Sequence, residues 1–453
     1  MILSKFKNNK HQQYLAQLPK IPQQLANIDT LYAPLDFRAT ILSSIANATQ
    51  RIYMVALYMD NDDAGHEILN ALYRAKQLRP KLEILILVDW HRAQRGRIGV
   101  TATNTNANWY CSMTNKHKQN ISIPIYGAPI NTREALGVLH LKGFIFDDTL
   151  LYSGASINNV YLHKHKKYRY DRYQLIKNQI LVETMINYIH HHLLTAVAVQ
   201  RLDYNDRPKN TNFKNKIRQF RFSLRRASYQ FQDQASNNEL AVTPLVGLGK
   251  LSILNTTIHH LMASANQKLT LCTPYFNLPA RLMNNIIYLL RRGKQVEIIV
   301  GDKTANDFFY SRRPAISNNR CIALSYEINL RRFLSQRQRY IDTGQLIVRL
   351  WKNGDNSFHL KGISIDEDWQ LITGNNLNPR AWRLDLENAI LIHDPKKEMR
   401  AQKHKELDCI RTYTTIIGNY LELESIHQYP IQVRKLIRRL RRISIDKLIN
   451  HIL

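Results

Sequence analysis

The chain has 453 residues, and 44% of them are apolar, which suits two or three domains with substantial cores. The formal net charge is +29, from 64 lysines and arginines against 35 aspartates and glutamates, so an anionic partner such as a phospholipid surface or a nucleic acid is expected. No apolar run approaches the roughly 20 residues that cross a bilayer, and residues 1–7 lack the apolar core of a signal peptide, which argues against a membrane-spanning or secreted protein.

The first half of the chain alternates helix and strand. Apolar residues at helical spacing predict a helix over residues 37–48, and the strand-like segment 52–57 follows it. A second helix is predicted over residues 68–75, before a buried strand over residues 82–88 that Asp89 closes. Strands that alternate with helices are typical of the α/β class.

Two signals in the middle of the chain can each be interpreted in two ways. The aromatic and basic mixture at 213–226 is compatible with nucleic-acid binding, but its apolar residues have helical spacing, so we predict a helix with an apolar core face. The Gly-Leu-Gly-Lys sequence at 247–250 lacks the rest of a phosphate-loop pattern and is interpreted as a turn before the next helix.

The order of elements then repeats. A helix is predicted over residues 251–261, a strand over 269–272, a helix over 282–290, and a buried strand over 296–300 that Asp302 closes. The repetition predicts two equivalent domains rather than one domain with two active loops.

Polar stretches place the boundary between these domains at residues 205–212 or 234–238. We therefore predict an N-terminal domain over residues 1–235, a C-terminal domain over 236–430, and a separate helix over 431–453.

Neither cysteine nor histidine usage indicates a metal site. The cysteines are scattered without a close pair, so we expect reduced thiols that mostly pack: Cys111, Cys272, Cys321 and Cys409. The run of histidines at 190–192 is interpreted as a surface cluster at a helix end. Reduced cysteines and the lack of a secretion signal together lead us to expect a cytoplasmic protein.

One short motif occurs twice, each time with a histidine, a lysine two residues later and an aspartate five residues after the lysine. On a strand, residues two apart point to the same face, so the histidine and lysine can reach one phosphate. A single match is more often an ordinary strand, but two copies in the same context predict phosphoryl chemistry. The candidate catalytic residues are His140, Lys142 and Asp147, and then His359, Lys361 and Asp366.

A glycine and a polar loop follow each copy. The glycines, Gly154 and Gly374, allow the backbone to approach a ligand closely, and the loop side chains offer neutral donors to phosphate oxygens. The candidate substrate-binding residues in these loops are Ser156, Asn158, Asn376 and Asn378.

At these residues the chain resembles the phospholipase D superfamily, whose signature is His-x-Lys, four residues, Asp, and then a Gly-Ser-x-Asn-like loop. Both loops depart from that pattern. Ala155 and Asn375 stand at the position of the common serine, and Asn158 and Asn378 come one position late.

Longer segments narrow the resemblance to the bacterial phosphatidylserine synthases of that superfamily; these segments are 88–99, 131–140, 300–307 and 374–388. The resemblance implies two similar phospholipase D-like domains, each a mixed sheet flanked by helices, with the active site at their interface. It also implies transfer of the phosphatidyl group of CDP-diacylglycerol to L-serine, with release of CMP. The residues by themselves indicate only phosphodiester chemistry.

Two histidines suit a reaction in which one imidazole attacks phosphorus and the other protonates the leaving oxygen. The family resemblance favours His140 as the nucleophile and His359 as the acid and then the base, although the two motifs are too similar to decide. The lysines would neutralise the non-bridging oxygens. We place Asp147 and Asp366 behind the imidazoles, where they would fix the tautomer. This arrangement requires no metal and no other cofactor.

Three charged residues after the second loop are further candidates. Arg380 and Arg383 are predicted to bind the diphosphate as planar forks, and Glu387 is predicted to orient a motif side chain or the ammonium group of the amino acid. Surface ion pairing is the alternative for all three.

The C-terminal segment predicts a basic amphipathic helix, with apolar residues from Val433 to Ile443 on one stripe and arginines and lysines around it. Such a helix either lies on an anionic bilayer at the inner face of the cell membrane or packs on the protein. The oligomeric state stays open. The sequence is also compatible with a nuclease or cardiolipin-type synthase, or with a ribosome- or nucleic-acid-binding protein without enzymatic activity.

Overall fold

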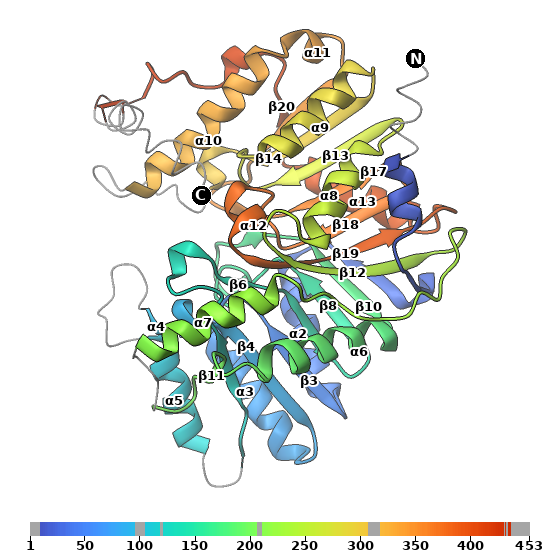
Figure 1. Cartoon of the computed structure of the whole chain (residues 1–453). Helices are drawn as coiled ribbons and strands as arrows, with labels where there is room; N and C mark the ends of the chain where they lie inside the picture. The colour runs from blue at the N-terminus through green and yellow to red at the C-terminus, as the bar shows by residue number, and fades with distance from the viewer. Residues whose placement is uncertain are drawn as a thin grey trace.

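The computed structural model describes residues 10–95, 105–117, 121–205, 211–306 and 318–429, together with Ile431, Arg434 and Lys435. Two α/β halves lie against each other, the first drawn mostly in blue and green and the second mostly in yellow and orange (Figure 1). The predicted fold class is therefore confirmed.

The first half is built on an eight-stranded sheet. Strands β3, β4 and β5 are parallel, and the other neighbours in the sheet are antiparallel. The order across the sheet is β11 (Gln200–Arg201), β5 (Ile125–Ala128), β4 (Glu83–Asp89), β3 (Arg51–Val55), β7 (Gly143–Phe146), β8 (Thr149–Ser153), β10 (Tyr173–Lys177) and β2 (Ile28–Leu31).

The second half has a ten-stranded sheet, again with three neighbouring parallel strands near one edge. Its order is β1 (Ile21–Pro22), β12 (Ala241–Leu248), β19 (Leu386–His393), β18 (Trp369–Thr373), β17 (Gly362–Ile365), β13 (Lys268–Thr273), β14 (Gln295–Gly301), β15 (Leu346–Trp351) and β20 (Thr414–Ile416), and β6 (Leu139–His140) pairs with β19 beside this path.

The two sheets repeat one strand order. Starting from β2 and from β12, each sheet runs through an antiparallel block into its three parallel strands. The register repeats as well, because Val55 of β3 pairs with Gly143 and Cys272 of β13 pairs with Gly362, which are the glycines directly after the two motif lysines. The internal repeat predicted from the sequence is present in the fold.

Helices cover the first sheet because their apolar residues fall on one side and polar residues begin them. Phe37, Ile41 and Ile45 of α2 are buried in the core, and the Asp62 side chain accepts a hydrogen bond from the Gly65 amide at the start of α3. The helical segments of this half are α2 (Pro34–Asn47), α3 (Asp63–Leu78), α4 (Trp90–Gln94), α5 (Asn106–His117), α6 (Gln179–Tyr188), the π-helical η3 (Ile189–Leu194), α7 (Thr211–Leu224) and the 3₁₀ turns η1 (Leu25–Asn27) and η2 (Glu134–Leu136).

The predicted helix within residues 213–226 is α7, and its apolar face is buried in the core of the first half, as expected. Of the predicted turn at 247–250, the first two residues end β12, and the chain turns at Gly249, which has a φ of +94°, before the next helix. In the histidine run, His190 Nε2 lies 2.7 Å from the Tyr53 hydroxyl.

The second half has its own helices and core. Strand β12 leads into α8, whose first turn is capped by the Ser252 side chain. The elements are α8 (Ile253–Ala263), α9 (Ala280–Arg291), η4 (Lys303–Ala305), α10 (Asn318–Ser335), α11 (Gln338–Asp342), α12 (Pro379–Arg383), α13 (Arg400–Arg411) and η5 (Tyr420–Glu422).

The N-terminal segment differs from the predicted domain division. Residues 10–16 are helical, β1 pairs with β12, and Leu15 and Leu18 lie in the core of the second half. Figure 1 shows this dark blue segment beside the second half. The chain therefore begins its described part on the second half and then crosses to the first, which a single boundary near residue 235 does not capture.

The predicted C-terminal amphipathic helix lies almost entirely outside the described residues. Within the described part of the chain, no helix is both long enough and apolar enough to cross a membrane.

Candidate active site

Two short strand pairs join the halves and place both motifs at the interface. Strand β6 of the first half runs parallel to β19 of the second, which sets His140 opposite Glu387. Strand β16 (Ser357–Phe358) runs parallel to β9 (Arg169–Tyr170), so His359, the next residue, lies close to Asp171. Each motif histidine is thus held against an acid from the other half.

His140 is anchored through one ring nitrogen. Its Nδ1 lies 2.8 Å from Glu387 Oε2. Burial raises the pKa of Glu387 well above its ordinary value, while the charges of Lys142 and Lys361 act in the opposite direction. In its ionised form Glu387 accepts the Nδ1 hydrogen and leaves the lone pair on Nε2. No described residue forms a hydrogen bond to Nε2. Burial, helped by the charges of Lys142 and Lys361, lowers the pKa of His140 well below its ordinary value. This lowered pKa favours the neutral imidazole, which is the form that can act as a nucleophile.

His359 has a more crowded setting. Its Nδ1 lies 2.9 Å from Asp171 Oδ2 and 3.0 Å from the Tyr161 hydroxyl, and the Lys361 ammonium contacts the ring. Asp171 and Tyr161 both belong to the first half. A carboxylate behind the ring stabilises the protonated imidazole, which suits a group that gives up a proton and takes one back.

The two lysines lie deep in the interface. The Lys142 ammonium donates to Ser156 Oγ at 2.9 Å and to the Ala155 carbonyl at 3.2 Å. Burial and the charge of Lys361 lower the pKa of Lys142 to about 7. The Lys361 ammonium lies 3.4 Å from Asp171 Oδ2.

The glycine of each loop packs against the lysine of the other half. A Cβ atom added to Gly374 would lie 2.8 Å from Lys142 Cγ, and one added to Gly154 would lie 3.0 Å from Lys361 Nζ. A side chain at Gly374 would therefore displace Lys142, and one at Gly154 would crowd Lys361 and also Asp171, whose Oδ2 would lie 2.9 Å from the added Cβ.

The residue after each acid fixes the backbone of a motif lysine. Asn388 follows Glu387, and it accepts from the Lys142 amide at 2.9 Å and donates to the Lys142 carbonyl at 2.8 Å. Arg172 follows Asp171 and donates to the Lys361 carbonyl at 3.2 Å. Each half therefore positions both the histidine and the lysine of its partner half.

Comparisons with known proteins agree with this geometry. Residues 258–408 match the family model described as "Cardiolipin synthase, PLD-like domain". Over 452 residues the chain is 62% identical to the CDP-diacylglycerol–serine O-phosphatidyltransferase PssA of Escherichia coli (strain K12), covering 100% of both chains. The chain belongs to the CDP-diacylglycerol–serine O-phosphatidyltransferase family. This confirms the family resemblance seen in the sequence.

Two further matches involve Haemophilus influenzae. The enzyme of the same name is 46% identical over 455 residues, covering 99% of each chain. The crystal structure of phosphatidylserine synthase from strain Rd KW20 has a TM-score of 0.95 and 46% identity, covering 99% of this chain and 100% of that one. The phospholipase D-like arrangement of two halves is thus shared with a solved member of the family.

The placement of Asp147 and Asp366 behind the imidazoles is wrong. Asp147 accepts hydrogen bonds from the amides of residues 49–51 at 2.7–3.2 Å, and Asp366 accepts from the amides of residues 266–268 at 2.6–2.8 Å. Each aspartate ends the strand that follows the lysine and turns the chain with a φ of +50°. Both side chains therefore bind backbone amides, and they do so at the opposite end of that strand from the histidine.

The four polar loop residues occupy two kinds of position. Ser156 contacts the Lys142 ammonium, and the buried side-chain Oδ1 of Asn376 has no hydrogen-bond partner among the described residues. Asn158 and Asn378 instead cap local turns, because their Oδ1 atoms accept from the amides three residues later at 3.0 and 2.9 Å. Ser156 is thus beside a motif lysine, and contact of all four with phosphate stays a prediction.

The charged residues after the second loop also divide. Glu387 contacts His140, which agrees with the prediction that it orients a motif side chain. Arg380 is mostly buried; its Nε lies 3.0 Å from Asp385 Oδ2, and its Nη2 donates to the Glu134 carbonyl at 2.9 Å. Arg383 is half-buried on α12. Diphosphate binding by these arginines stays a prediction.

Sequence reasoning missed Asp171 and Tyr161. Asp171 has a usable signal, because it lies two residues before β10, which pairs with β8, just as Glu387 lies at the start of β19, which pairs with β18. Tyr161 carries no such signal, since its contact with His359 depends on how the halves meet. Among the described residues, no group of three or more histidine, cysteine, aspartate or glutamate side chains is placed to hold a metal ion.

Proposed function

We propose that the chain transfers the phosphatidyl group of CDP-diacylglycerol to the hydroxyl of L-serine and releases CMP. The observation that carries the proposal is the pair of inward-facing His-x-Lys motifs, each backed by an acid from the other half, in a chain that matches phosphatidylserine synthases over its whole length. The names of the relatives support the choice of substrates, and the contacts of the two histidines support the division of labour proposed below.

In the first step His140 Nε2 attacks the phosphorus of the phosphatidyl group. A P–N bond forms, the P–O bond to CMP breaks, and His359 donates a proton to the leaving phosphate oxygen. We assign His140 as the nucleophile because Glu387 anchors its Nδ1 and because its lowered pKa favours the neutral ring, which has a lone pair for attack.

In the second step the serine hydroxyl attacks the phosphatidyl-histidine. His359 takes the hydroxyl proton, the P–O bond to serine forms, and the P–N bond to His140 breaks to release phosphatidylserine. Lys142 and Lys361 stabilise the charge that builds on the non-bridging oxygens in both steps, and Ser156 holds Lys142 toward that position.

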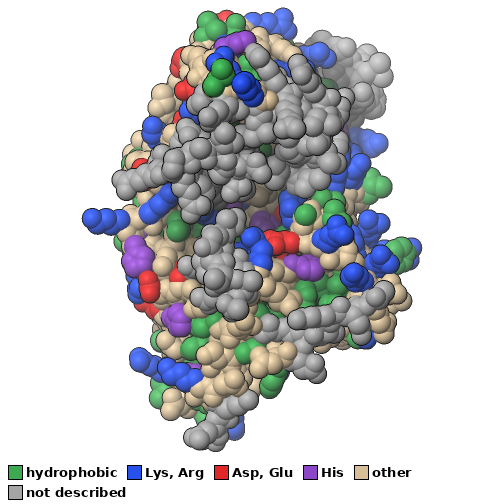
Figure 2. Space-filling view, turned by 90° about the vertical axis from the view of Figure 1, so that its left-hand side faces the viewer, with side chains coloured by type: hydrophobic (Ala, Val, Ile, Leu, Met, Phe, Trp, Pro, Cys, Tyr) green, Lys and Arg blue, Asp and Glu red, His purple; other side chains and the backbone are tan. Residues whose placement is uncertain are grey.

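The charge of the chain supports action at an anionic membrane surface, with CDP-diacylglycerol drawn from the bilayer. The net charge is +29, and on the face in Figure 2 the blue lysine and arginine side chains cover more area than the red acidic ones. We infer peripheral association with anionic phospholipid at the inner face of the cell membrane, and the same charge would attract other polyanions such as the ribosome.

The test is CMP release from CDP-diacylglycerol in mixed anionic micelles, with and without L-serine, while the lipid product is followed. We expect serine-dependent formation of phosphatidylserine, and its loss in His140→Ala and His359→Ala. Release of CMP with only phosphatidic acid as product would mean a hydrolase. No CMP from the unmodified chain would contradict the proposal altogether.

A cardiolipin-type synthase is the second candidate, because residues 258–408 match a family model with that description. The same assay separates the two functions when L-serine is replaced by phosphatidylglycerol. Formation of cardiolipin in place of phosphatidylserine would favour this second candidate.

A further inference from the structure

The acceptor in the proposed reaction is a zwitterion, which sets a requirement on its binding site. L-Serine carries an ammonium and a carboxylate beside its hydroxyl, so a carboxylate and a cation must lie near the base that takes the hydroxyl proton. The acids Glu387 and Asp171 already hold the motif histidines. Recognition of the ammonium group therefore calls for a different acid.

Asp60 and Arg92 form a loosely engaged ion pair in the first half. Asp60 lies beyond the end of β3, Arg92 lies on α4 beyond the end of β4, and Arg92 Nη2 is 3.5 Å from Asp60 Oδ1, which also accepts from the Asn106 side chain at 3.0 Å. The side chains of Arg92 and Asp60 are only 13% and 7% exposed. The Arg92 guanidinium stacks over the Tyr58 ring, 4.5 Å from its centroid. Among the described residues, Asp60 is the one hydrogen-bond acceptor of this guanidinium. Both charges are shielded from water and neither is fully satisfied by the other.

Two chains of hydrogen bonds connect this pair to the motif histidines. On one side, the Arg92 amide and the Leu139 amide both donate to the Asp89 carboxylate at 2.8 Å, and Leu139 directly precedes His140. Arg92 and the strand that carries the nucleophile are thus fixed to one buried acid.

On the other side, the Asn158 side chain lies 3.5 Å from Asp60 Oδ2 and accepts from the Tyr161 amide at 3.0 Å. The Tyr161 hydroxyl in turn lies 3.0 Å from His359 Nδ1. The Asp60–Arg92 pair is therefore tied through one loop to the histidine that would accept the serine hydroxyl proton.

The repeat shows that this charge pair belongs to one half only. Because Val55 and Cys272 occupy the same register position, Asp60 corresponds to Asn277 in the second half. Asp89 and Asp302 each cap the short helix at the end of the next strand, and the positions after Asp302 that correspond to Arg92 hold an uncharged threonine and alanine. In this repeat, both charges are therefore present in the first half alone.

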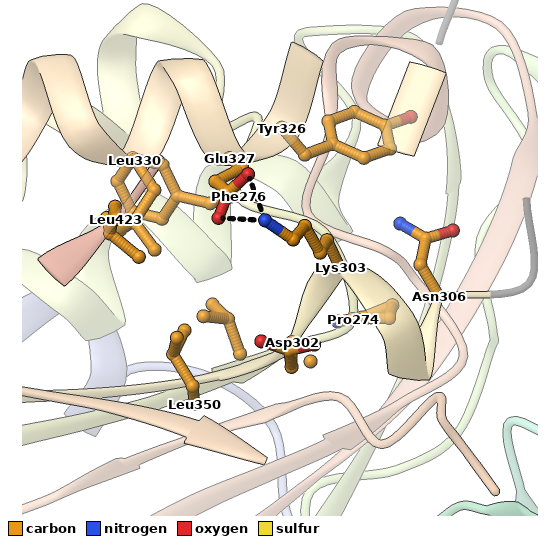
Figure 3. Close-up of a pocket in the computed structure, with 12 residues that line it drawn as sticks. Pro274, Phe276, Asp302, Lys303, Asn306, Tyr326, Glu327, Leu330, Leu350 and Leu423 are labelled. Carbon is orange, nitrogen blue, oxygen red and sulfur yellow. Dashed lines mark hydrogen bonds and ion pairs between the residues drawn. The ribbon is translucent and has the colours of Figure 1, made fainter. Parts of the chain in front are cut away.

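The corresponding region of the second half offers no free charge among its described residues. Figure 3 shows Lys303 pointing at Glu327, 3.2 Å away, and Lys303 also lies 2.7 Å from Glu424. The cavity beside these residues has a volume of about 20 Å³, which is room for a water molecule and not for an amino acid.

We propose that Asp60 and Arg92 recognise the acceptor amino acid, with Asp60 accepting hydrogen bonds from the serine ammonium and Arg92 donating to the serine carboxylate. This inference rests on the proposed function. The two residues bind both charged ends of serine, and so present its hydroxyl to the phosphatidyl-histidine. No bond is made or broken at either residue, so their effect falls on acceptor affinity and choice.

The test measures two reactions in the full-length chain and in Asp60→Asn and Arg92→Gln. The first is serine-dependent CMP release, which yields the KM for L-serine. The second is exchange of labelled CMP into CDP-diacylglycerol without any acceptor, which reports only the first chemical step. We expect the serine KM to rise by about 10- to 100-fold in each variant, the usual effect of losing a charge-assisted hydrogen bond, while CMP exchange stays near its normal rate.

Two serine analogues, used as competitors of serine transfer, assign the two charges separately. Ethanolamine lacks the carboxylate, so its inhibition should weaken in Asp60→Asn and persist in Arg92→Gln. 3-Hydroxypropionate lacks the ammonium, so its inhibition should weaken in Arg92→Gln and persist in Asp60→Asn. If both variants lost inhibition by ethanolamine and by 3-hydroxypropionate to the same extent, the assignment of the two charges would be overturned.

The matched control is Asp63→Asn, which neutralises a nearby acid whose side chain is 64% exposed and pairs with His165. It should change neither reaction, and thermal unfolding should show all three variants folded. An unchanged serine KM in Asp60→Asn, or a parallel loss of CMP exchange, would overturn this inference while leaving the proposed function standing. Absence of serine-dependent CMP release from the unmodified chain would contradict the proposed function itself, and the acceptor site with it.

Discussion

Asp147 and Asp366 each accept hydrogen bonds from three consecutive backbone amides, and this contact determines what their loss should do. In Asp147→Ala these amides lose their acceptor, and alanine must adopt a φ near +50°. We expect the free energy of unfolding to fall by about 1–3 kcal/mol, with turnover per folded molecule close to that of the unmodified chain. Chemical unfolding and serine-dependent CMP release would be measured side by side.

The neighbouring Asp148→Ala is the control, since the Asp148 side chain is 38% exposed and, within the described part of the chain, its carboxylate pairs only with Arg51, at 3.1 Å. Asp148→Ala should lower the free energy of unfolding by less than about 1 kcal/mol. Burial opposes ionisation of Asp147, but its backbone amides outweigh burial and lower its pKa below 3.8, so the stabilisation is complete above that value and is lost as the pH falls through the native pKa. Unchanged stability with lost turnover in Asp147→Ala would contradict the backbone role.

The ionisation of Lys142 should make the reaction slower at alkaline pH. Burial and the charge of Lys361 lower its pKa to about 7, so this ammonium loses its proton as the pH rises through neutrality. We expect kcat/KM for CDP-diacylglycerol to decline above about pH 7, because that ratio reports groups of the free enzyme. Lys142→Arg keeps its charge, so the decline should move to higher pH even if the maximum rate is lower. An identical alkaline decline in both proteins would show that another group causes it.

Single residues of the site were predictable to different extents. His140, Lys142, His359 and Lys361 were found because spacing on a strand places side chains on one face, and because the pattern occurs twice. The aspartates of the motif were found but misplaced, since sequence spacing does not reveal that the strand between lysine and aspartate carries the carboxylate away from the histidine. The acids that do contact the imidazoles come from the other half of the chain.

At the scale of elements, the feature most open to test is the packing of each glycine loop against the motif lysine of the other half. In Gly374→Ala the added Cβ would lie 2.8 Å from Lys142 Cγ, which forces the lysine away from its position between the halves. We expect the rate of CMP release to fall by about 10-fold or more because the lysine acts on the transition state. The measurement is steady-state CMP release together with circular dichroism.

Gly418→Ala is the matched control, because its added Cβ would meet only the Glu422 side chain at 3.3 Å. It should leave CMP release near normal. Equal rates for Gly374→Ala and the unmodified chain would contradict the crossed arrangement of loops and lysines.

The regular elements were predictable because their periodicity is strong, as in α2, β4, α9 and β14. The pairs β6–β19 and β9–β16 were not, since each involves a strand of only two residues and depends on how the halves meet. The predicted first domain, residues 1–235, included β1, although β1 pairs with β12 of the second half. A strand of two residues carries too little pattern to show which sheet it joins.

At the scale of the whole molecule, charge and the C-terminal basic sequence make a joint prediction about membrane binding. The net charge is +29, and arginines and lysines are concentrated after residue 430. A chain that ends before Val433 should sediment less with anionic vesicles, while neutral vesicles should bind neither form. Added salt should weaken the binding of both forms, because screening acts on all exposed charges. If the shortened chain sedimented with anionic vesicles as well as the unmodified chain, the C-terminal segment would not be the membrane anchor.

The whole molecule needs both halves for either histidine, so its central claim is a covalent intermediate formed in a shared site. The most direct measurement is rapid quenching of the chain with CDP-diacylglycerol in the absence of L-serine, followed by mass spectrometry of its peptides. The account predicts a phosphatidyl group on the peptide that contains His140, which disappears when L-serine is added before the quench. A lipid adduct on His359, or serine transfer with no adduct on either histidine, would contradict it.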